Sequence, residues 1–316
     1  MIWALLQPIQ EHAAAAAEHG AEEGPFNAGK VILEHVSDSS LEHPLIHLPK
    51  IMGIDFSVTK HVFMLWVVAV VAFVVVTWVV RKYLKQTVPT GAANGLEFIV
   101  EFVRDSIVQP NVGKKWVNTW APVLLTFFTF IFASNLIGMI PVFDLIGLVD
   151  HYAIHSSPES FLARVVHGGT TPTGNYNVTA GLAIITFFSI IVAGTLAHGF
   201  VKHFKNIVPH GLAWPIYIIL IPIEVMGLFV KPFALTMRLA ANMTGGHIAI
   251  LAVTSLIFLL TEMFQSAMAG MAVGFFLSVP LNVFISGLEL IVIVVQAYVF
   301  TLLSAVFIGM AIHVHH

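Results

Sequence analysis

The stretch that decides the fold runs from residue 213 to residue 260 and reads AWPIYIILIPIEVMGLFVKPFALTMRLAANMTGGHIAILAVTSLIFLL. A second block, residues 266–312, is just as apolar. A helix needs only about 20 residues to cross a bilayer, so each block predicts either two spans or one long, tilted helix. We expect one long helix in each, because no cluster of turn residues interrupts the first block. Its isolated Pro222 and Pro232 would bend a helix rather than end it.

The composition is that of a membrane protein. Hydrophobic residues make up 58% of the 316 residues and charged residues only 10%, and the mean hydropathy is +0.90. Soluble domains carry about 25% charged residues. The chain has no cysteine, which excludes a disulfide framework and thiol chemistry.

Three further apolar stretches are long enough to be membrane spans, at about residues 61–80, 119–140 and 179–201. Residues 1–58 are polar and His-rich, and they favour a solvated segment over a metal site because no ligand spacing stands out. The predicted fold is an all-α polytopic membrane protein. It has an extramembrane segment at residues 1–58 and a membrane domain at residues 59–316, with about five membrane helices, of which the last two are long and strongly tilted.

One additional helix, near residues 92–115, is predicted to lie flat in the membrane interface. Its apolar residues share one helical face, and these are Leu96, Ile99, Val100, Val103, Ile107 and Val108. Its charged residues lie largely on the opposite face, and these are Glu97, Glu101, Arg104 and Asp105. Such an amphipathic pattern is typical of a helix at the bilayer surface.

Lysine and arginine counts predict the orientation, because cytoplasmic loops carry an excess of these residues. Residues 81–117 hold six of them and residues 202–210 hold two, whereas residues 142–177 hold only Arg164. We therefore expect the first two segments inside, the N-terminus outside and the C-terminus inside. The three histidines around the second inner segment are interpreted as interfacial, and these are His198, His203 and His210.

Charged and polar residues interrupt the first long block at regular intervals. Glu224, Lys231 and Arg238 are spaced by seven residues, so they fall on nearly one helical face, with Asn242 one turn beyond. His247 follows nine residues after Arg238, about 180° around the helix. A charged side chain inside a span costs about 2.5–3.5 kcal/mol on insertion scales, so these residues are functional candidates.

The second block adds Glu289 and Gln296, again seven residues apart. The two long helices are predicted to be antiparallel. If Arg238 faces Gln296, His247 and Glu289 then share one outer depth, since they lie about 13 Å and 10 Å outward of those two residues. Glu224 lies about 21 Å inward of Arg238. A fixed cation between a titratable pair and a separate carboxylate predicts two half-channels that do not join.

Structural interpretations stay open for several of these residues. Glu224 and Lys231 could form an ion pair near the inner headgroups, with the Lys231 stem lying along apolar surface. His247 could serve only as a hydrogen-bonding group between helices, and Arg238 could be structural.

Four motifs in these stretches resemble subunit a of the F-type ATP synthases, over roughly residues 60–312. The central one is KPFALTMRLAANMTGGH at residues 231–247, and Glu224 stands where that family often has a glutamate. The other three are SNLIGMIP at residues 134–141, PTGNYNVTA at residues 172–180 and QAYVFTLL at residues 296–303.

One departure from the commonest bacterial pattern of that family is informative. Many bacterial members have a glutamate where this chain has His247 and a histidine where it has Glu289. The exchange resembles the arrangement in mitochondrial members. It keeps one acid and one imidazole, as two residues in functional contact would.

The resemblance implies a mechanism and a set of partners. A ring of c subunits, each with a buried carboxylate, would move past the two long helices. Arg238, which keeps its proton, would favour the ionised form of each passing carboxylate and block proton leakage. His247, Glu289, Asn242, Gln296, Glu224 and Lys231 would belong to the proton path. Peripheral-stalk (b-type) subunits, the remaining ATP synthase subunits and the lipid bilayer are the other implied partners, with no nucleic acid.

The chain is not expected to be an enzyme on its own, and no cofactor or metal is expected. It lacks the G-x-x-x-x-G-K-[ST] phosphate loop, so ATP would be made on other subunits. The alternative function is a secondary ion transporter of another class, but no internal repeat supports it. The expected location is the bacterial inner membrane rather than the mitochondrial one.

Overall fold

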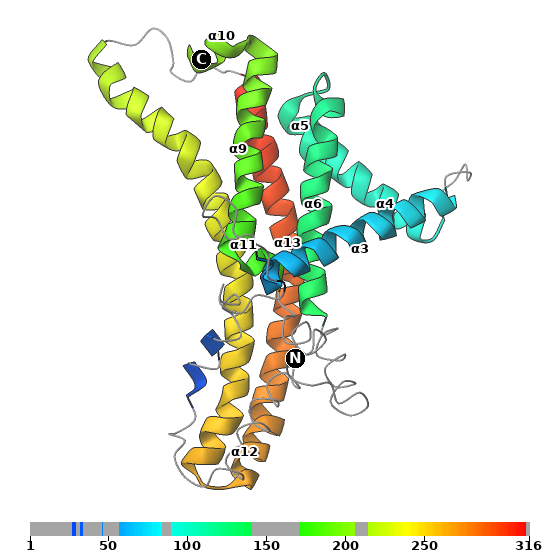
Figure 1. Cartoon of the computed structure of the whole chain (residues 1–316), viewed down its shortest axis with the longest axis vertical. Coiled ribbons are helices and arrows are strands. Elements are labelled where there is room, and N and C mark those ends of the chain that lie inside the picture. The colour runs from blue at the N-terminus through cyan, green and yellow to red at the C-terminus, as the bar shows by residue number, and fades with distance from the viewer. Residues whose placement is uncertain are drawn as a thin grey trace. The chain divides into compact units, whose positions relative to one another are not determined.

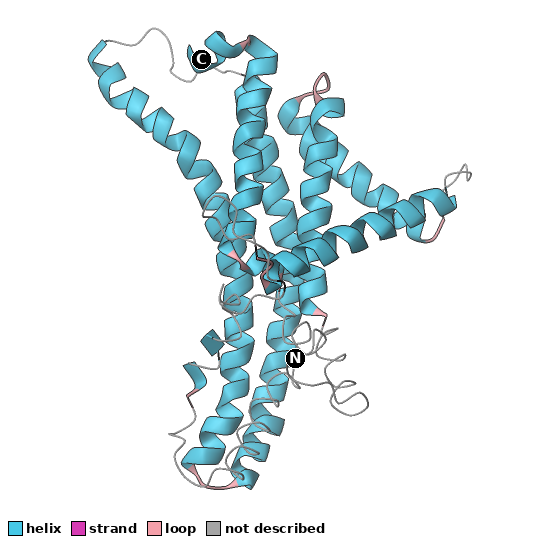
Figure 2. Ribbon diagram, in the orientation of Figure 1, coloured by secondary structure: helices cyan, strands magenta, loops and turns pink. Residues whose placement is uncertain are grey.

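The computed structural model describes residues 27–29, 32–33, 46, 57–83, 90–140, 171–205 and 214–313. The longer described ranges are almost entirely helical (Figure 2). Within the described part, the β-pairing is an isolated antiparallel bridge between Ile46 and Val58. Most of the expected extramembrane segment, residues 1–58, and most of the loop at 142–177 lie outside the described residues.

Within the described ranges, five helices are long and apolar enough to cross a membrane, which confirms the predicted fold class. The first three are α3 (Lys60–Tyr83), α6 (Val117–Met139) and α9 (Tyr176–His198) (Figure 1). The fourth is α11 (Trp214–Met263). The fifth spans Gly270–Ile312 and joins α12 (Ala267–Val273), a π-helical segment η4 (Gly274–Ser278) and α13 (Val279–Ile312). Each long apolar block is thus one helix, as expected, and its tilt in a bilayer stays a prediction.

Helix α11 continues through both of its prolines, as the sequence predicts. Pro222 and Pro232 each lie inside the helix. The hydroxyl of Thr236 donates a hydrogen bond to the carbonyl of Pro232, at 3.1 Å. The helix ends at Met263, and Gln265, with a φ of 50°, turns the chain before α12 begins.

The helix that is predicted to lie in the interface, called the interfacial helix below, has the two faces that its sequence pattern predicts. It is built from α4 (Ala92–Glu101), a π-helical segment η1 (Phe102–Val108) and α5 (Gln109–Val112). Its charged residues Glu97, Glu101, Arg104 and Asp105 are exposed, and Val103, Ile107 and Val108 are buried. The Arg104–Asp105 ion pair, at 2.7 Å, lies on the exposed face and lowers the pKa of Asp105 through its hydrogen bonds.

The chain divides into two compact units. The described parts of Met1–Val67, Asn135–Asn175 and Asn242–Val292 form unit 1, and those of Val68–Ser134, Tyr176–Ala241 and Ile293–His316 form unit 2. Helices α11 and α13 contribute residues to both.

In unit 1, the second half of α11 runs antiparallel to α12 and the first half of α13 (Figure 1, yellow to orange). The two helical runs meet closely at glycines. A side chain on Gly274 would contact Ile257 at 3.3 Å, and one on Gly270 would meet the backbone oxygen of Ile257 at 3.0 Å. The amide of Asn282 donates a hydrogen bond to the hydroxyl of Thr254 at 2.7 Å.

Unit 2 holds a hydrophobic core built from five helical segments. Buried residues come from the interfacial helix, α6, α9, α11 and α13, and include Ile107, Ile131, Ala193, Leu239 and Ile308. The rings of Phe127 and Phe300 pack edge to face at 5.6 Å. Helix α13 comes so close to α5 that a side chain on Gly309 would lie 2.9 Å from the carbonyl carbon of Asn111.

Two of the three histidines that were interpreted as interfacial, His198 and His203, make contacts that the sequence did not predict, and their depth in a bilayer stays a prediction. Gly199, with a φ of 85°, reverses the chain after α9, and the short helix α10 (Phe200–Lys205) follows. This turn folds the imidazole of His203 onto Gly194 of α9, where His203 is buried. His198 is bonded to the carbonyl of Ile312 at 2.9 Å, and His210 lies outside the described residues.

Candidate functional site

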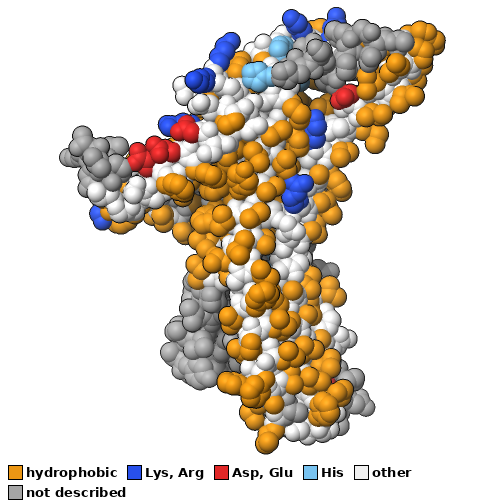
Figure 3. Space-filling model, turned by 180° about the vertical axis from the view of Figure 1, so that it is seen from behind, with side chains coloured by type: hydrophobic (Ala, Val, Ile, Leu, Met, Phe, Trp, Pro, Cys, Tyr) orange, Lys and Arg blue, Asp and Glu red, His pale blue; other side chains and the backbone are white. Residues whose placement is uncertain are grey.

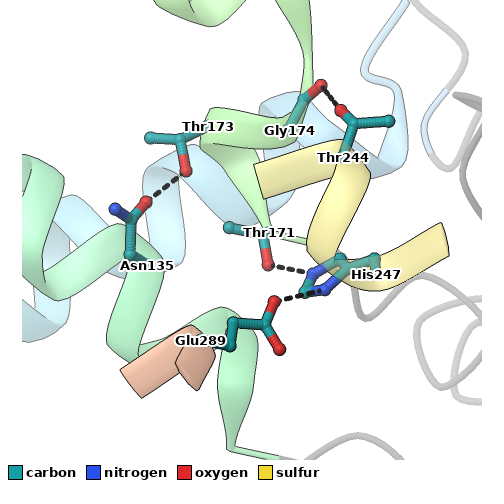
Figure 4. Close-up of polar contacts among 7 residues, drawn as sticks. All are labelled: Asn135, Thr171, Thr173, Gly174, Thr244, His247 and Glu289. Carbon is teal, nitrogen blue, oxygen red and sulfur yellow. Dashed lines mark hydrogen bonds and ion pairs between the residues drawn. The ribbon is translucent and has the colours of Figure 1, made fainter. Parts of the chain in front are cut away.

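An imidazole and a carboxylate form an ion pair between the two long helices in unit 1 (Figure 4). His247 Nδ1 of α11 lies 2.9 Å from Glu289 Oε1 of α13. Glu289 is 6% exposed, and the His247 side chain is about a quarter exposed. Both facing atoms are buried, and the contact is an ion pair when the imidazole is protonated. The sequence predicts a shared depth for these two residues, and the structure brings them into contact.

The residue before His247 explains how the carboxylate fits against α11. A side chain on Gly246 would lie 3.0 Å from Glu289 Oε1 and 3.3 Å from its carboxyl carbon. Glycine leaves the helix backbone bare at this point, so the carboxyl group can pack beside the ring of His247.

The other ring nitrogen of His247 also has a partner, which the sequence interpretation did not include. Thr171 Oγ1 lies 2.7 Å from His247 Nε2 (Figure 4). Thr171 stands just before a short 3₁₀ helix, η3 (Pro172–Gly174), that leads into α9. Thr171 precedes the PTGNYNVTA motif of residues 172–180, and the sequence gave no sign of this contact because 76 residues separate the two partners.

Two further hydrogen bonds anchor this turn. The hydroxyl of Thr173 donates to the side-chain oxygen of Asn135 on α6. The hydroxyl of Thr244 on α11 donates to the carbonyl of Gly174 at 3.1 Å (Figure 4). Thr244 lies three residues before His247, so the same helix that carries the histidine also holds the turn that contacts it.

The remaining polar residues of α11 have different surroundings. Arg238 and Asn242 are both exposed. Among the described residues, no ion pair is found for Arg238.

Glu224 and Lys231 do not form the ion pair that the sequence left open. Within the described residues, Lys231 Nζ instead lies over the ring of Phe307 on α13, at 5.5 Å from its centroid. Both side chains are half-buried. A cation over an aromatic ring is a favourable contact, and the lysine stem lies along apolar surface.

Gln296 is buried on α13, at 4% exposure, while Arg238 is exposed. No hydrogen bond joins the two within the described part of unit 2. The placement of Arg238 opposite Gln296 stays a prediction, and the His247–Glu289 contact that it led to is present.

Polar groups also occur farther along the helix pair of unit 1. Ser278 and Asn282 stand one turn apart, and Ser278 Oγ and Asn282 Oδ1 are buried without a hydrogen-bond partner among the described residues. Buried polar atoms without protein partners are sites where ordered water binds.

The chemistry of the His247–Glu289 pair suits the transfer of a proton. The described residues contain no group of three or more side chains of the metal-ligating types. An imidazole changes its charge within the physiological pH range, and a contacting carboxylate can take or give the same proton. The pair can therefore hold a proton within apolar helices and pass it between His247 Nδ1 and Glu289 Oε1.

The chain is similar to one family of proteins over most of its length. The sequence profile described as ATP synthase A chain matches residues 62–309. "ATP synthase subunit a 2" of Prosthecochloris aestuarii is 40% identical over 309 residues, covering 95% of this chain and 84% of the relative. "ATP synthase subunit a 2" of Chlorobium luteolum is 42% identical over 294 residues, covering 90% and 76%. "ATP synthase subunit a" of Anaeromyxobacter dehalogenans is 38% identical over 335 residues, covering 98% and 77%.

Proposed function

The chain belongs to the ATP synthase A chain family, and on this premise we propose that it moves protons through two offset half-channels past Arg238. Membership makes it the proton-translocating stator subunit of the membrane sector, and nothing favours a transporter of another class. The observation that carries the proposal is the ion pair of His247 and Glu289 between the two long helices.

In this proposal, His247 and Glu289 form the proton relay of the outer half-channel. The buried polar atoms of Ser278 and Asn282 support it, because water bound there would line a polar route along the same two helices. A proton that crosses the membrane through the chain releases about 2.3 kcal/mol per 100 mV.

Glu224 is proposed to line the inner half-channel, with Lys231 tuning its charge and Asn242 and Gln296 completing the path. Arg238 is proposed to face the carboxylates of a ring of c subunits. Its exposure supports this role, because a permanent charge on an apolar helix needs a counter-charge. An arginine keeps its proton, so it favours the ionised carboxylate and makes each ring subunit release its proton before passing.

The other partners are proposed from the family. They are peripheral-stalk subunits of b type and the remaining subunits of the complex, on which ATP is made. The proposed location is a bacterial inner membrane, with the N-terminus outside and the C-terminus inside. The bacterial relatives and the lysine and arginine counts support this arrangement.

Replacing Arg238 tests the proposal. Arg238→Ala is expected to abolish ATP synthesis driven by a proton gradient in inverted membrane vesicles. Arg238→Lys is not expected to restore it, because a buried ammonium can lose its proton and lacks the planar fork of arginine. The amount of assembled complex, measured by blotting, is the control. A normal rate of ATP synthesis by the assembled Ala variant would refute the proposal.

A further inference from the structure

The ring of His247 is held at both nitrogens in unit 1, by groups from different segments. Glu289 Oε1 lies 2.9 Å from Nδ1, and Thr171 Oγ1 lies 2.7 Å from Nε2 (Figure 4). An imidazole ring that is held at both nitrogens cannot rotate without losing both contacts. The orientation that points Nδ1 at Glu289 therefore depends on Thr171 as well as on the carboxylate.

Thr171 is itself fixed in place. It is 1% exposed, and its backbone is extended, with a φ of −72° and a ψ of 118°, as expected for a residue before a proline. Its carbonyl accepts a hydrogen bond from the backbone N–H of Gly174 at 3.0 Å. Asn135 on α6 and Thr244 on α11 hold this turn by hydrogen bonds. The segment that places the Thr171 hydroxyl beside His247 is therefore fixed from two helices.

A glycine on α6 makes room for this threonine. A Cβ atom on Gly138 would lie 2.6 Å from the Cβ of Thr171 and 2.8 Å from its Cγ2. Carbon atoms do not approach so closely, so any side chain at position 138 would displace Thr171 from His247.

The chemistry of a hydroxyl suits a ring that changes its protonation state. A hydroxyl group can both donate and accept a hydrogen bond. It can accept from Nε2–H when the ring is charged, and donate to a bare Nε2 when the ring is neutral with its proton on Nδ1. A backbone carbonyl could do only the first. Thr171 can therefore hold the ring through a whole cycle of proton uptake and release.

We propose that Thr171 is a positioning residue for His247, whose hydroxyl keeps Nδ1 aimed at Glu289 in both protonation states of the ring. The proposal rests on the outer relay described above and names a member of that site from outside the two long helices. Thr171 acts through His247 and exchanges no proton with the ring subunits.

The test uses the whole complex in proteoliposomes and measures the initial rate of ATP synthesis. The pH on the outer side is varied while a potassium diffusion potential keeps the total driving force constant. In Thr171→Val, the Nε2–H of the charged ring would lose its hydrogen-bond partner, so the charged ring forms only at a higher proton concentration. The acid midpoint is the outer pH at which the rate of ATP synthesis is half its maximum. It is therefore expected to fall by about one pH unit, which corresponds to a tenfold higher proton concentration.

Two variants separate the hydroxyl from the shape of the side chain. Thr171→Ser keeps the hydroxyl and is expected to restore most of the wild-type midpoint. Thr301→Val is the matched control, because Thr301 is also buried and its hydroxyl bonds, among the described residues, the carbonyl of Ala297 in its own helix, at 2.8 Å. It is expected to leave the midpoint unchanged.

Gly138→Ala is an independent variant, because it leaves Thr171 in the sequence but moves its side chain away from His247. It is expected to show the same acid shift as Thr171→Val, and it decides the question if the valine variant does not assemble. A wild-type midpoint in assembled Thr171→Val or Gly138→Ala would overturn the proposal. So would an equal loss of rate at every pH that serine does not restore, because that marks a purely structural role.

His247→Leu, measured in parallel, keeps the two levels of inference apart. If its rate is low while Thr171→Val behaves as wild type, the relay stands and the role of Thr171 is refuted. If His247→Leu itself has the wild-type rate and pH profile, the outer relay fails, and the role of Thr171 fails with it. In the His247→Leu background, Thr171→Val is expected to have no further effect on the midpoint, since the residue it positions is gone.

Discussion

At the scale of single residues, the charged side chains of the site differ in whether they have a partner of opposite charge among the described residues. Glu289 is buried, and an unpaired carboxylate in such surroundings would be costly, so the adjacent imidazole of His247 offsets part of the cost of burial. Arg238 is exposed on an apolar helix, and no ion pair is found for it among the described residues. An acid and an imidazole in contact can exchange a proton, whereas an arginine keeps its own.

Exchanging the acid and the imidazole tests whether they act as a pair. His247→Glu and Glu289→His, made singly, place two like groups side by side and are expected to slow proton-driven ATP synthesis about tenfold or more. The double variant restores one acid and one imidazole in contact, so it is expected to recover much of the rate. The rates are measured in inverted vesicles and normalised to the amount of assembled complex.

The rate of the double variant, compared with the rates of the two single variants, shows whether the two residues are coupled. If the double variant is as slow as the product of the two single effects, the residues act independently, and the 2.9 Å contact has no functional role. If both single variants keep the full rate, the pair is structural.

At the scale of elements, close helix packing in unit 2 depends on where the glycines lie. A Cβ atom on Gly309 of α13 would lie 2.9 Å from the carbonyl carbon of Asn111 on α5. Nothing lies within 4 Å of the position that a Cβ would take on Gly181 of α9. The same substitution is therefore expected to have opposite effects at these two positions.

Gly309→Ala is expected to force α13 away from α5 and to cost about 1–3 kcal/mol, as overpacking does. Gly181→Ala is the matched control and is expected to be neutral or slightly stabilising, because alanine favours the helix by about 1 kcal/mol over glycine. The thermal midpoint of the purified complex in detergent measures both. Equal midpoints in the two variants would contradict the close approach of α13 and α5.

A second element, α10, is expected to depend on pH through His203. Burial lowers the pKa of His203 below its ordinary value of 6.5, and the nearby charge of His198 lowers it further. The unfolded chain therefore binds more protons than the folded one between the lowered pKa and 6.5. The stabilising contribution is complete above pH 6.5 and is lost as the pH falls through that window.

Replacing His203 by Gln is expected to reduce the loss of stability that occurs as the pH falls. The thermal midpoint of the purified complex, measured between pH 5 and pH 8, should fall toward acid less steeply in His203→Gln than in the wild type. His198→Gln should leave a steep dependence, because burial is the larger cause of the shift. If wild type and His203→Gln have the same slope, the docking of His203 on Gly194 does not control the stability of this region.

The sequence predicted well those elements whose pattern can be recognised within one continuous segment, by its periodicity or its length. The five apolar helices and the two faces of the interfacial helix followed from such patterns, as did the shared depth of His247 and Glu289. What it missed depends on contacts between distant segments. Thr171 reaches His247 across 76 residues, and the burial of His203 depends on a glycine turn that brings α10 back onto α9.

At the scale of the whole molecule, the notable feature is how much apolar surface the long helices leave uncovered. Many large hydrophobic side chains of α11 and α13 are more than 40% exposed, including Phe229, Phe233, Phe284 and Ile291. Hydrophobic side chains also cover much of the described surface on the face drawn in Figure 3. Lipid can cover such a surface, and so can a ring of apolar helices. The exposed Arg238 and Asn242 on α11 favour the ring for that part of the helix, because lipid tails offer no partner for a cation.

Two isoleucines on α11 make the proposed ring contact testable with a matched control. Ile248 is 40% exposed and Ile250 is 3% exposed, although they lie two residues apart in the same helix of unit 1. Ile248→Cys is expected to form a disulfide with a cysteine placed on the outer surface of the ring subunit, because that bond needs Cα atoms within about 4.4–6.8 Å. Ile250→Cys faces the interior of unit 1 and is expected to form none. Copper-catalysed oxidation of native membranes, followed by blotting for the joined species, gives the measurement. Equal yields from both positions would show that burial in the isolated chain does not predict the contact. Labelling of Ile248→Cys by a lipid-soluble thiol reagent, with no joined species for any ring cysteine, would assign this face to lipid and restrict the ring to other surfaces.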